Sequence, residues 1–243
     1  MNELDFTGRL VVITGVGRAG QVGEAIALGF ARRGATLALL DVQTPEVEAR
    51  AAALVAQGFT ATAHTANLAD SAAAERAAAD VIERTRDRFA GRVHAVICVA
   101  GGFSATGALD SSEPAQWQKQ FMINLDTAYN ATRAFLPAVR LAQGSFVYFG
   151  SVAALPGGKS AGLAAYSAAK SGVLALMRAV AADERANGVR ANAVAPTQVR
   201  TAANIDAMGA DKDYVERDSV ADVVAFLASP LARNVSSQVI TLA

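Results

Sequence analysis

Short apolar runs alternate with longer segments of helical periodicity along the whole chain. The run at 9–14, Arg-Leu-Val-Val-Ile-Thr, is typical of a parallel strand that is buried on both faces. Similar runs predict strands at 9–14, 36–40, 60–65, 95–99, 145–149, 189–194 and 238–242. Helical spacing and end signals predict helices at 22–33, 45–57, 69–88, 113–143 (bent near Pro137), 164–187 and 219–227.

This alternation predicts right-handed βαβ units, because parallel strands need a crossover connection that is usually a helix. The expected fold is an α/β, doubly wound Rossmann fold: a parallel seven-stranded sheet with helices on both faces. No internal repeat, low-complexity tract or linker interrupts the pattern. Residues 1–243 are therefore interpreted as one dinucleotide-binding and catalytic domain.

Composition narrows the class of protein. The formal net charge is zero and no basic run occurs, which argues against nucleic acid or a membrane surface as partner. The first residues are acidic and no apolar run reaches ~20 residues, so a cytoplasmic location is expected. Cys98 lies in an apolar run and is predicted to be a buried thiol. His64 and His94 have no metal-ligand spacing, so no metal is expected.

Tyr166 and Lys170 are four residues apart on a predicted helix, so both side chains project from one face. Ser151 ends a predicted strand fifteen residues earlier. A phenolate at neutral pH requires a shift of about 4 kcal/mol, and a cation about 4 Å away supplies a comparable energy. The three residues predict proton transfer to or from an alcohol or ketone oxygen. The Tyr-x-x-x-Lys spacing alone is weak support, because it also arises by chance.

A glycine-rich turn at 14–23 joins the first strand to the first helix. Its amides and the helix dipole favour a pyrophosphate. The residues predicted to contact the cofactor there are Gly15, Gly17, Arg18, Gly20, Gln21, Val22 and Gly23. Asp41 follows the second strand, where a carboxylate accepts hydrogen bonds from ribose hydroxyls and repels a 2′-phosphate. NAD is therefore predicted over NADP, with Arg18 as a contrary signal.

With these residues assembled, the chain resembles the short-chain dehydrogenase/reductase family along nearly its whole length. The family pattern is T-G-x-x-x-G-x-G, Asn-Asn-Ala-Gly, a helical Asn, a Ser, Y-x-x-x-K, and Pro-Gly followed by Thr. The matching positions are Thr14, Gly15, Gly23, Ala100, Gly101, Asn124, Ser151, Tyr166, Lys170, Pro196 and Thr201.

The resemblance implies four catalytic residues. Tyr166 would be the general acid/base, and Lys170 would lower its pKa and bind the nicotinamide ribose. Ser151 would polarise the substrate oxygen, and Asn124 would anchor a proton-relay water. Further implied cofactor contacts are Val42, Asn67, Leu68, Ala100, Gly101, Tyr166, Lys170, Pro196, Val199 and Thr201.

Several positions depart from the family pattern. The turn is two residues longer, with Gln21 where the second glycine is expected. Cys98–Val99 replaces the Asn-Asn pair, Asn67 replaces an aspartate, and Thr197 replaces the glycine after Pro196. The stretch that usually forms a substrate lid is short, which predicts a more open pocket.

The predicted function is an NAD(H)-dependent oxidoreductase that interconverts a neutral or weakly polar secondary alcohol and its ketone. One alternative is a 3-oxoacyl-carrier-protein-type reductase, which the non-basic Gln143 and Asn187 disfavour, since such enzymes dock their carrier through basic residues there. Another is a non-catalytic NAD-binding sensor or partner subunit. The resemblance also implies a homodimer or homotetramer formed through the helices that carry Asn124 and Tyr166.

Overall fold

The structure, a computed structural model, describes residues 4–243. Within this range seven strands form one parallel sheet in the order β3-β2-β1-β4-β5-β6-β7, which confirms the predicted fold class. The strands are β1 Leu10–Thr14, β2 Thr36–Asp41, β3 Ala61–Thr65, β4 Ala95–Cys98, β5 Ser145–Phe149, β6 Arg190–Pro196 and β7 Val239–Leu242. The order reverses between β1 and β4, and ligands of such sheets bind at this point.

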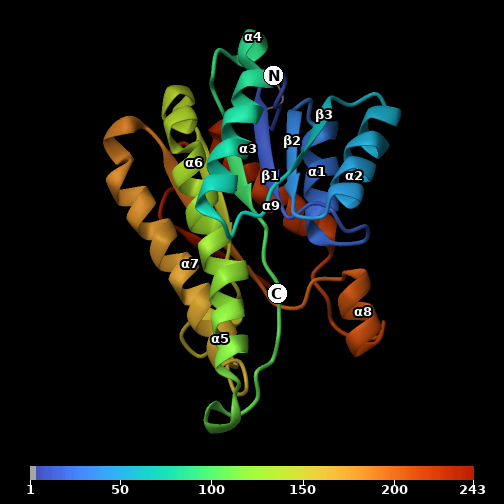
Figure 1. Ribbon diagram of the computed structural model, residues 1–243, viewed down its shortest axis with the longest axis vertical. Coiled ribbons are helices and arrows are strands. Elements are labelled where there is room, and N and C mark those ends of the chain that lie inside the picture. Colours follow the sequence, from blue (N-terminus) through green and yellow to red (C-terminus); the bar gives the residue numbers. More distant parts are fainter. Residues whose placement is uncertain (1–3) are drawn as a thin grey trace.

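Helices cover both faces of the sheet (Figure 1). One face carries α1 Val22–Arg32, α2 Thr44–Ala56 and α9 Arg217–Ala228. The other carries α3 Ser71–Arg84, α6 Thr127–Ala142 and α7 Ala164–Asp183. Three short helices are α4 Arg86–Phe89, α5 Pro114–Phe121 and α8 Ala202–Met208, and 3-10 turns lie at Leu109–Ser111, Val152–Ala154, Arg185–Asn187 and Pro230–Ala232.

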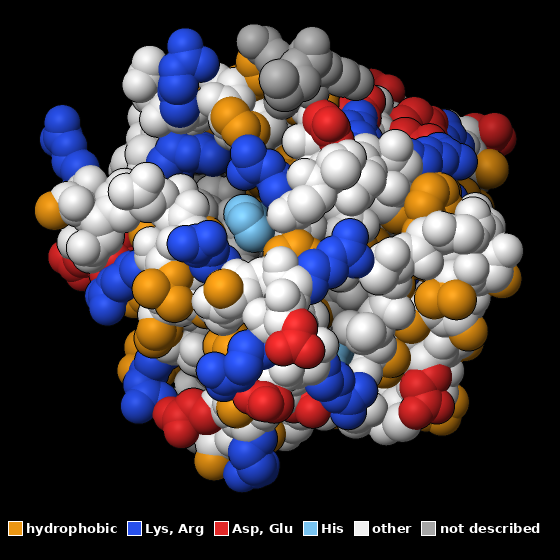
Figure 2. Space-filling view, turned by 90° about the horizontal axis from the view of Figure 1, so that it is seen from above, with side chains coloured by type: hydrophobic (Ala, Val, Ile, Leu, Met, Phe, Trp, Pro, Cys, Tyr) orange, Lys and Arg blue, Asp and Glu red, His pale blue; other side chains and the backbone are white. Residues whose placement is uncertain are grey.

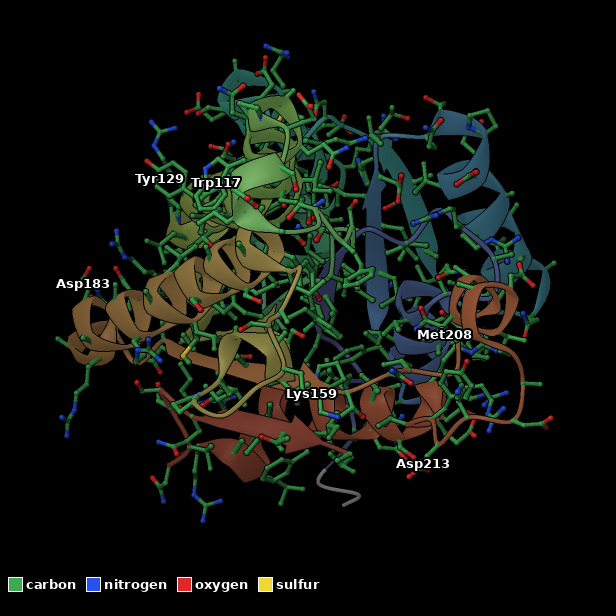
Figure 3. All side chains as sticks on the ribbon, turned by 90° about the horizontal axis from the view of Figure 1, so that it is seen from below. Trp117, Tyr129, Lys159, Asp183, Met208 and Asp213 are labelled. Atoms are coloured by element: carbon green, nitrogen blue, oxygen red, sulfur yellow. The ribbon has the colours of Figure 1, made fainter. Side chains whose placement is uncertain are left out.

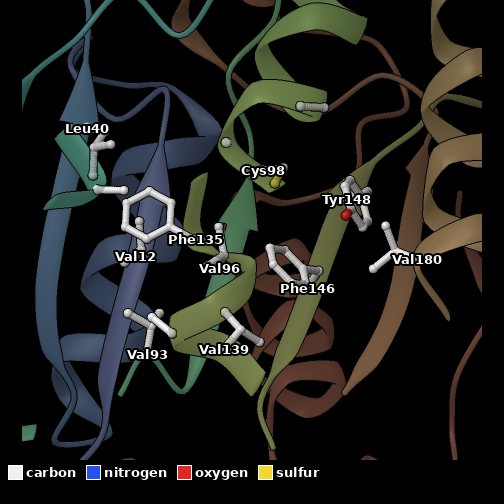
Figure 4. Packing of buried hydrophobic residues seen from close by; sticks show 14 of the residues in the cluster. Val12, Leu40, Val93, Val96, Cys98, Phe135, Val139, Phe146, Tyr148 and Val180 are labelled. Carbon is white, nitrogen blue, oxygen red and sulfur yellow. The ribbon is translucent and has the colours of Figure 1, made fainter. Parts of the chain in front are cut away.

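A hydrophobic core lies on each face of the sheet, as expected for strands that are apolar throughout. Figure 4 shows the core beneath α6, where Phe135, Phe146 and Tyr148 pack over the central strands. The Tyr148 hydroxyl lies 2.8 Å from Thr132 Oγ1, which satisfies the buried polar group. Cys98 is buried in this core, and burial raises the pKa of its thiol to about 12. The thiol is therefore structural and unreactive.

The predicted helix at 113–143 is interrupted at a different place from the one expected. A π-helical segment, Met122–Asp126, separates α5 from α6, whereas Pro137 lies inside the continuous helix α6. The Asn124 side chain lies within this segment and bonds both to Gln120, one turn earlier, and to Gly102 on a neighbouring loop. A π segment inside a helix is frequent at functional sites.

Helix α8 was not predicted from the sequence. It has only seven residues, too few for an apolar periodicity, and tertiary contacts define it. The Thr201 hydroxyl accepts from Asn204 N at its start, and the Tyr214 hydroxyl donates to Gly209 O at its end. The segment expected to form a short lid therefore contains a helix. No helix among residues 4–243 has the length and apolar character needed to cross a membrane.

Candidate active site

A cleft of about 560 Å³ lies beyond the carboxyl ends of β1, β2 and β4, within the usual size range of small-molecule sites. Predicted cofactor residues that line it are Gly15, Arg18, Gln21, Asp41, Val42, Asn67, Leu68, Ala100 and Gly101. Predicted cofactor residues outside its lining are Gly17, Gly20, Val22, Gly23, Tyr166, Lys170, Pro196, Val199 and Thr201. Gly102, at the start of a segment (102–109) that the sequence predicted to be a pocket wall, also lines it. The sequence did not point to its other lining residues, Gln43, Glu46, Ala66, Ala69, Val99, Lys119, Met122, Ile123 and Thr127.

The glycine turn packs so closely against its neighbours that side chains do not fit. A Cβ at Gly15, whose φ is 72°, would lie 2.7 Å from Ala100 Cα. A Cβ at Gly23 would lie 2.4 Å from Gly15 O. The lengthened turn therefore still forms a bare backbone surface beside the cleft, with the amino end of α1 behind it.

Two carboxylates meet beside this turn. Asp41 accepts from Gly17 N at 2.8 Å and from Gln43 N at 3.1 Å. Glu46, on α2, also lines the cleft, and its Oε2 is buried without a hydrogen-bond partner among the described residues. Arg18 is exposed on the same cleft. Glu46 was missed because its distance from the turn depends on how α2 docks.

The loop after β3 forms another wall of the cleft. Asn67 Oδ1 accepts from Ala69 N at 3.1 Å, and the Nδ2 group of this side chain donates to no residue that the structure describes. Leu68 O accepts from Asn130 Nδ2 at 2.9 Å, so α6 fixes the loop. The residue that replaces the family's aspartate is thus held in place and offers an N–H donor.

Thr14 joins the ends of β1 and β4, beneath the cleft. Its hydroxyl accepts from the amides of Val99 and Ala100, both at 3.1 Å. Next along the chain, a Cβ at Gly101 would lie 3.4 Å from Lys170 Nζ and 2.6 Å from Asn124 Oδ1. Gly101 therefore marks the place where the cleft meets the predicted proton-transfer residues.

Ser151, Tyr166 and Lys170 come together at this end of the cleft. Lys170 is buried, its Nζ donates to Phe149 O at 2.9 Å, and it lies 5.9 Å from the centre of the Tyr166 ring. Burial lowers the pKa of Lys170 to about 8. Burial also raises the pKa of Tyr166 above 10.0, while the hydrogen bond with Ser151 lowers it by less. The predicted lowering by Lys170 is thus not found here, because desolvation of the phenol outweighs the other influences.

The Asn124 side chain is buried, and its polar atoms form hydrogen bonds within the protein. It accepts from Gly102 N at 3.2 Å and donates to Gly102 O and Gln120 O, both at 3.0 Å. This ties the loop after β4 to the π segment. Anchoring of a water, as the resemblance implies, would therefore involve the main chain of Asn124.

The loop after β4 contacts the ring of Tyr166 through an aromatic side chain. Phe103 packs edge-on against Tyr166, with ring centres 5.1 Å apart, although 65% of Phe103 is exposed. The loop that carries Lys159 and helix α8, which ends at Met208, both lie on the face of the molecule that Figure 3 shows from below. Ala202 N donates to Gly20 O at 3.0 Å, so α8 is joined to the glycine turn.

Comparison with known proteins agrees with this architecture. The family described as enoyl-(acyl carrier protein) reductase matches residues 15–242. An uncharacterized short-chain type dehydrogenase/reductase of Sinorhizobium fredii is 33% identical over 96% of this chain and 95% of its own length. Meso-2,3-butanediol dehydrogenase of Serratia marcescens is 32% identical over 81% of this chain and 73% of its own. The crystal structure of levodione reductase superposes with a TM-score of 0.85 and 30% identity, covering 97% and 96% of the two chains.

The fold and its relatives define an oxidoreductase that acts on CH–OH and C=O groups. The chain belongs to the short-chain dehydrogenase/reductase family, as its resemblance predicted. Members of this family bind a nicotinamide cofactor, NAD or NADP.

Proposed function

We propose that this protein is an NAD(H)-dependent oxidoreductase that interconverts a secondary alcohol and a ketone, with Tyr166 as general acid/base. The observation that carries the proposal is the meeting of Ser151, Tyr166 and Lys170 at one end of a cleft. By their names, meso-2,3-butanediol dehydrogenase and levodione reductase act on secondary alcohols or ketones, which supports this substrate class.

The residues of the cleft fit a dinucleotide. Gly15 lines the cleft, and the absence of a Cβ at Gly15 and Gly23 lets the turn pack closely against Ala100 and against itself, which gives the turn the compact backbone that pyrophosphate-binding turns have. The buried, unpartnered Glu46 Oε2 and the neighbouring Asp41 suit ribose hydroxyls as hydrogen-bond donors. When bound, a nicotinamide cofactor supplies or accepts the hydride.

The protein's own residues handle the proton. Tyr166 takes the hydroxyl proton of an alcohol during oxidation and returns it to the ketone oxygen during reduction. Ser151, which hydrogen-bonds with Tyr166, holds the same substrate oxygen. Lys170 donates to Phe149 O, which holds its ammonium group 5.9 Å from the centre of the Tyr166 ring.

The two directions of the reaction should respond oppositely to pH. Alcohol oxidation should rise as pH increases, because it needs the deprotonated form of Tyr166, whose pKa lies above 10.0 in the structure. Ketone reduction should fall above pH 8, because Lys170, with a pKa of about 8, then loses its proton and cannot resupply Tyr166. Initial rates measured from about pH 6 to about pH 10 test this. A reduction rate that climbs with pH would contradict the assignment.

Cofactor preference is predicted from the two carboxylates. NADH should bind about 10- to 100-fold more tightly than NADPH, because a desolvated 2′-phosphate beside Asp41 and Glu46 would be repelled. Fluorescence titration measures both affinities. The double variant Asp41→Ala with Glu46→Gln should narrow the difference to about threefold or less. Glu48→Gln, which removes a charge from an exposed position of the same helix, should leave it unchanged. Tighter binding of NADPH by the unaltered protein would show that Arg18 dominates.

We also propose that two copies associate through α5, α6 and α7. Trp117 and Tyr129 are 39% and 48% exposed and lie on the same side of the molecule (Figure 3). Trp117 stacks near Phe121, with ring centres 5.0 Å apart, so this side offers an aromatic surface. Light scattering should give a dimer or tetramer mass. Trp117→Glu with Tyr129→Glu should give monomers, whereas Val55→Glu on α2 should not; a monomeric parent protein would refute the proposal.

A further inference from the structure

A second hollow, of about 530 Å³, lies at the opposite edge of the sheet from the candidate active site. It is bounded by the end of α7, the start of β6 and the segment before β7. We call it the arginine cleft, after Arg178, Arg185, Arg190 and Arg233, which line it. Figure 2 looks onto this edge of the sheet and shows Lys and Arg side chains spread across it, with Asp and Glu side chains among them.

Three of these arginines have no counter-charge. The side chains of Arg178, Arg185 and Arg233 form no hydrogen bond or ion pair with any described residue, and all three are exposed. No Asp or Glu lines the cleft. The chain has zero formal net charge, so this concentration of positive charge is local. Uncompensated arginines gathered in a concave surface favour an anionic ligand.

The acidic residues nearest in sequence do not neutralise the cleft. Glu184 is buried and accepts from Arg140 Nε at 2.6 Å and from Asn187 Nδ2 at 2.8 Å. Asp183 follows Arg178 by five residues, which turns it roughly 140° around α7. Neither carboxylate forms an ion pair with Arg178, Arg185 or Arg233 in the described structure.

Arg190 also lines the cleft, and backbone carbonyl groups hold its guanidinium group in place. It donates to Leu227 O at 2.6 Å and to Ser229 O at 3.1 Å, so the end of α9 fixes its guanidinium. Burial, and then the charge of Arg9, lowers the pKa of Arg190. His94 lies at the same edge. Burial, and then the charges of Arg9 and Arg92, lower the pKa of His94 to about 4. The cleft thus lies in a region of positive potential.

Neutral hydrogen-bond donors complete the lining. Ser236 Oγ accepts from Ala191 N at 3.3 Å, which leaves its own proton free to donate. Ser237 N donates to Ala191 O at 2.7 Å with a left-handed φ of 64°, which fixes the loop that presents Ser236. Gly188 and Ala182 add no bulk, so a ligand can approach the backbone.

We propose that the arginine cleft binds a small molecule bearing a chain of two or more phosphates, at a site separate from the candidate active site. A planar guanidinium group can donate to two phosphate oxygens at once. Several unpaired guanidinium groups are therefore best matched by a ligand with several anionic groups. A volume near 530 Å³ suits a small molecule, since such sites span roughly 300–1,000 Å³. A single orthophosphate would contact only some of the arginines that line the cleft.

Calorimetric titration with inorganic triphosphate tests the proposal, with saturating NADH present to occupy the glycine turn. Triphosphate should bind, and orthophosphate should bind about 10-fold or more weakly, because it meets fewer guanidinium groups. Arg178→Gln with Arg185→Gln should weaken triphosphate binding by about 100-fold. Arg76→Gln, which removes one charge from exposed α3, should change it by less than about twofold.

Folding of each variant is checked by its NADH affinity and melting temperature, which should match those of the unaltered protein. Triphosphate affinity that survives the double Arg replacement would overturn the proposal, as would equal loss in Arg76→Gln. Equal affinities for orthophosphate and triphosphate would overturn the assignment of a phosphate chain. Binding of an acidic protein without any binding of triphosphate would also overturn it. If NADH does not bind, the proposed function fails, whereas the same comparison of triphosphate affinities, made without NADH and with folding checked by melting temperature, still tests this site.

Discussion

Replacing Tyr166 with Phe should lower kcat for alcohol oxidation by about 1,000-fold while leaving NADH affinity within about threefold. The substitution removes only the hydroxyl, so the ring remains to pack against Phe103. The expected loss reflects the removal of the group that exchanges a proton with the substrate oxygen. Steady-state rates on a panel of secondary alcohols and ketones, together with an NADH titration, measure both effects.

Tyr129→Phe is the matched control, because it removes the same hydroxyl from a tyrosine that is 48% exposed on α6. It should keep full activity. Tyr166→Phe that retains more than about a tenth of the activity would show that another group carries the proton. An unaltered protein that binds NADH but turns over no substrate in the panel, with Tyr166→Phe keeping its biological effect, would favour the sensor alternative.

Gly15→Ala should destabilise the protein by about 3–5 kcal/mol and abolish cofactor binding. Gly15 has a φ of 72°, and an added Cβ would lie 2.7 Å from both Ala100 Cα and Ala100 N. Main-chain atoms at the end of β4 cannot move aside as a flexible side chain can. The substitution therefore combines backbone strain with overpacking beneath the cleft. Urea unfolding measures the loss of stability.

Gly58→Ala separates these two contributions. Gly58 has a φ of 85°, but a Cβ there meets nothing within 4 Å. It should cost only about 1–2 kcal/mol, from the left-handed backbone alone, and should leave NADH binding unchanged. Equal costs for the two substitutions would mean that the contact with Ala100 has no energetic importance.

The strands could be predicted from the sequence because a parallel strand buried on both faces must be apolar throughout. The runs at Leu10–Thr14 and Ser145–Phe149 show this pattern, and the structure places strands there. The π segment at Met122–Asp126 could not be predicted, since its side-chain pattern continues that of the helices on either side. Tertiary hydrogen bonds from Asn124 to Gly102 accompany this segment, and no local signal encodes them.

Much of the candidate site was predictable for a related reason. Asp41 and the glycine turn follow adjacent strands, and carboxyl ends of parallel strands meet at one edge of the sheet. Glu46 was not identified, because its position depends on the docking of α2. The segment 102–109 was predicted to be a pocket wall, but the contact of Phe103 with Tyr166 could not be read from the sequence. The direction of the Tyr166 pKa shift was also missed, since the extent of its burial cannot be read from spacing.

The reversal of strand order between β1 and β4 has a consequence for biosynthesis. On one side β1 pairs with β2, the next strand in the chain. On its other side β1 pairs with β4, and Val11 lies opposite Ala95, far away in the sequence. During translation the first three strands are complete well before β4 emerges, and such long-range pairing forms slowly. The candidate cofactor cleft spans this seam, because Gly15 and Ala100 lie on its two sides. A chain that ends before β4 therefore lacks one wall of the candidate cleft.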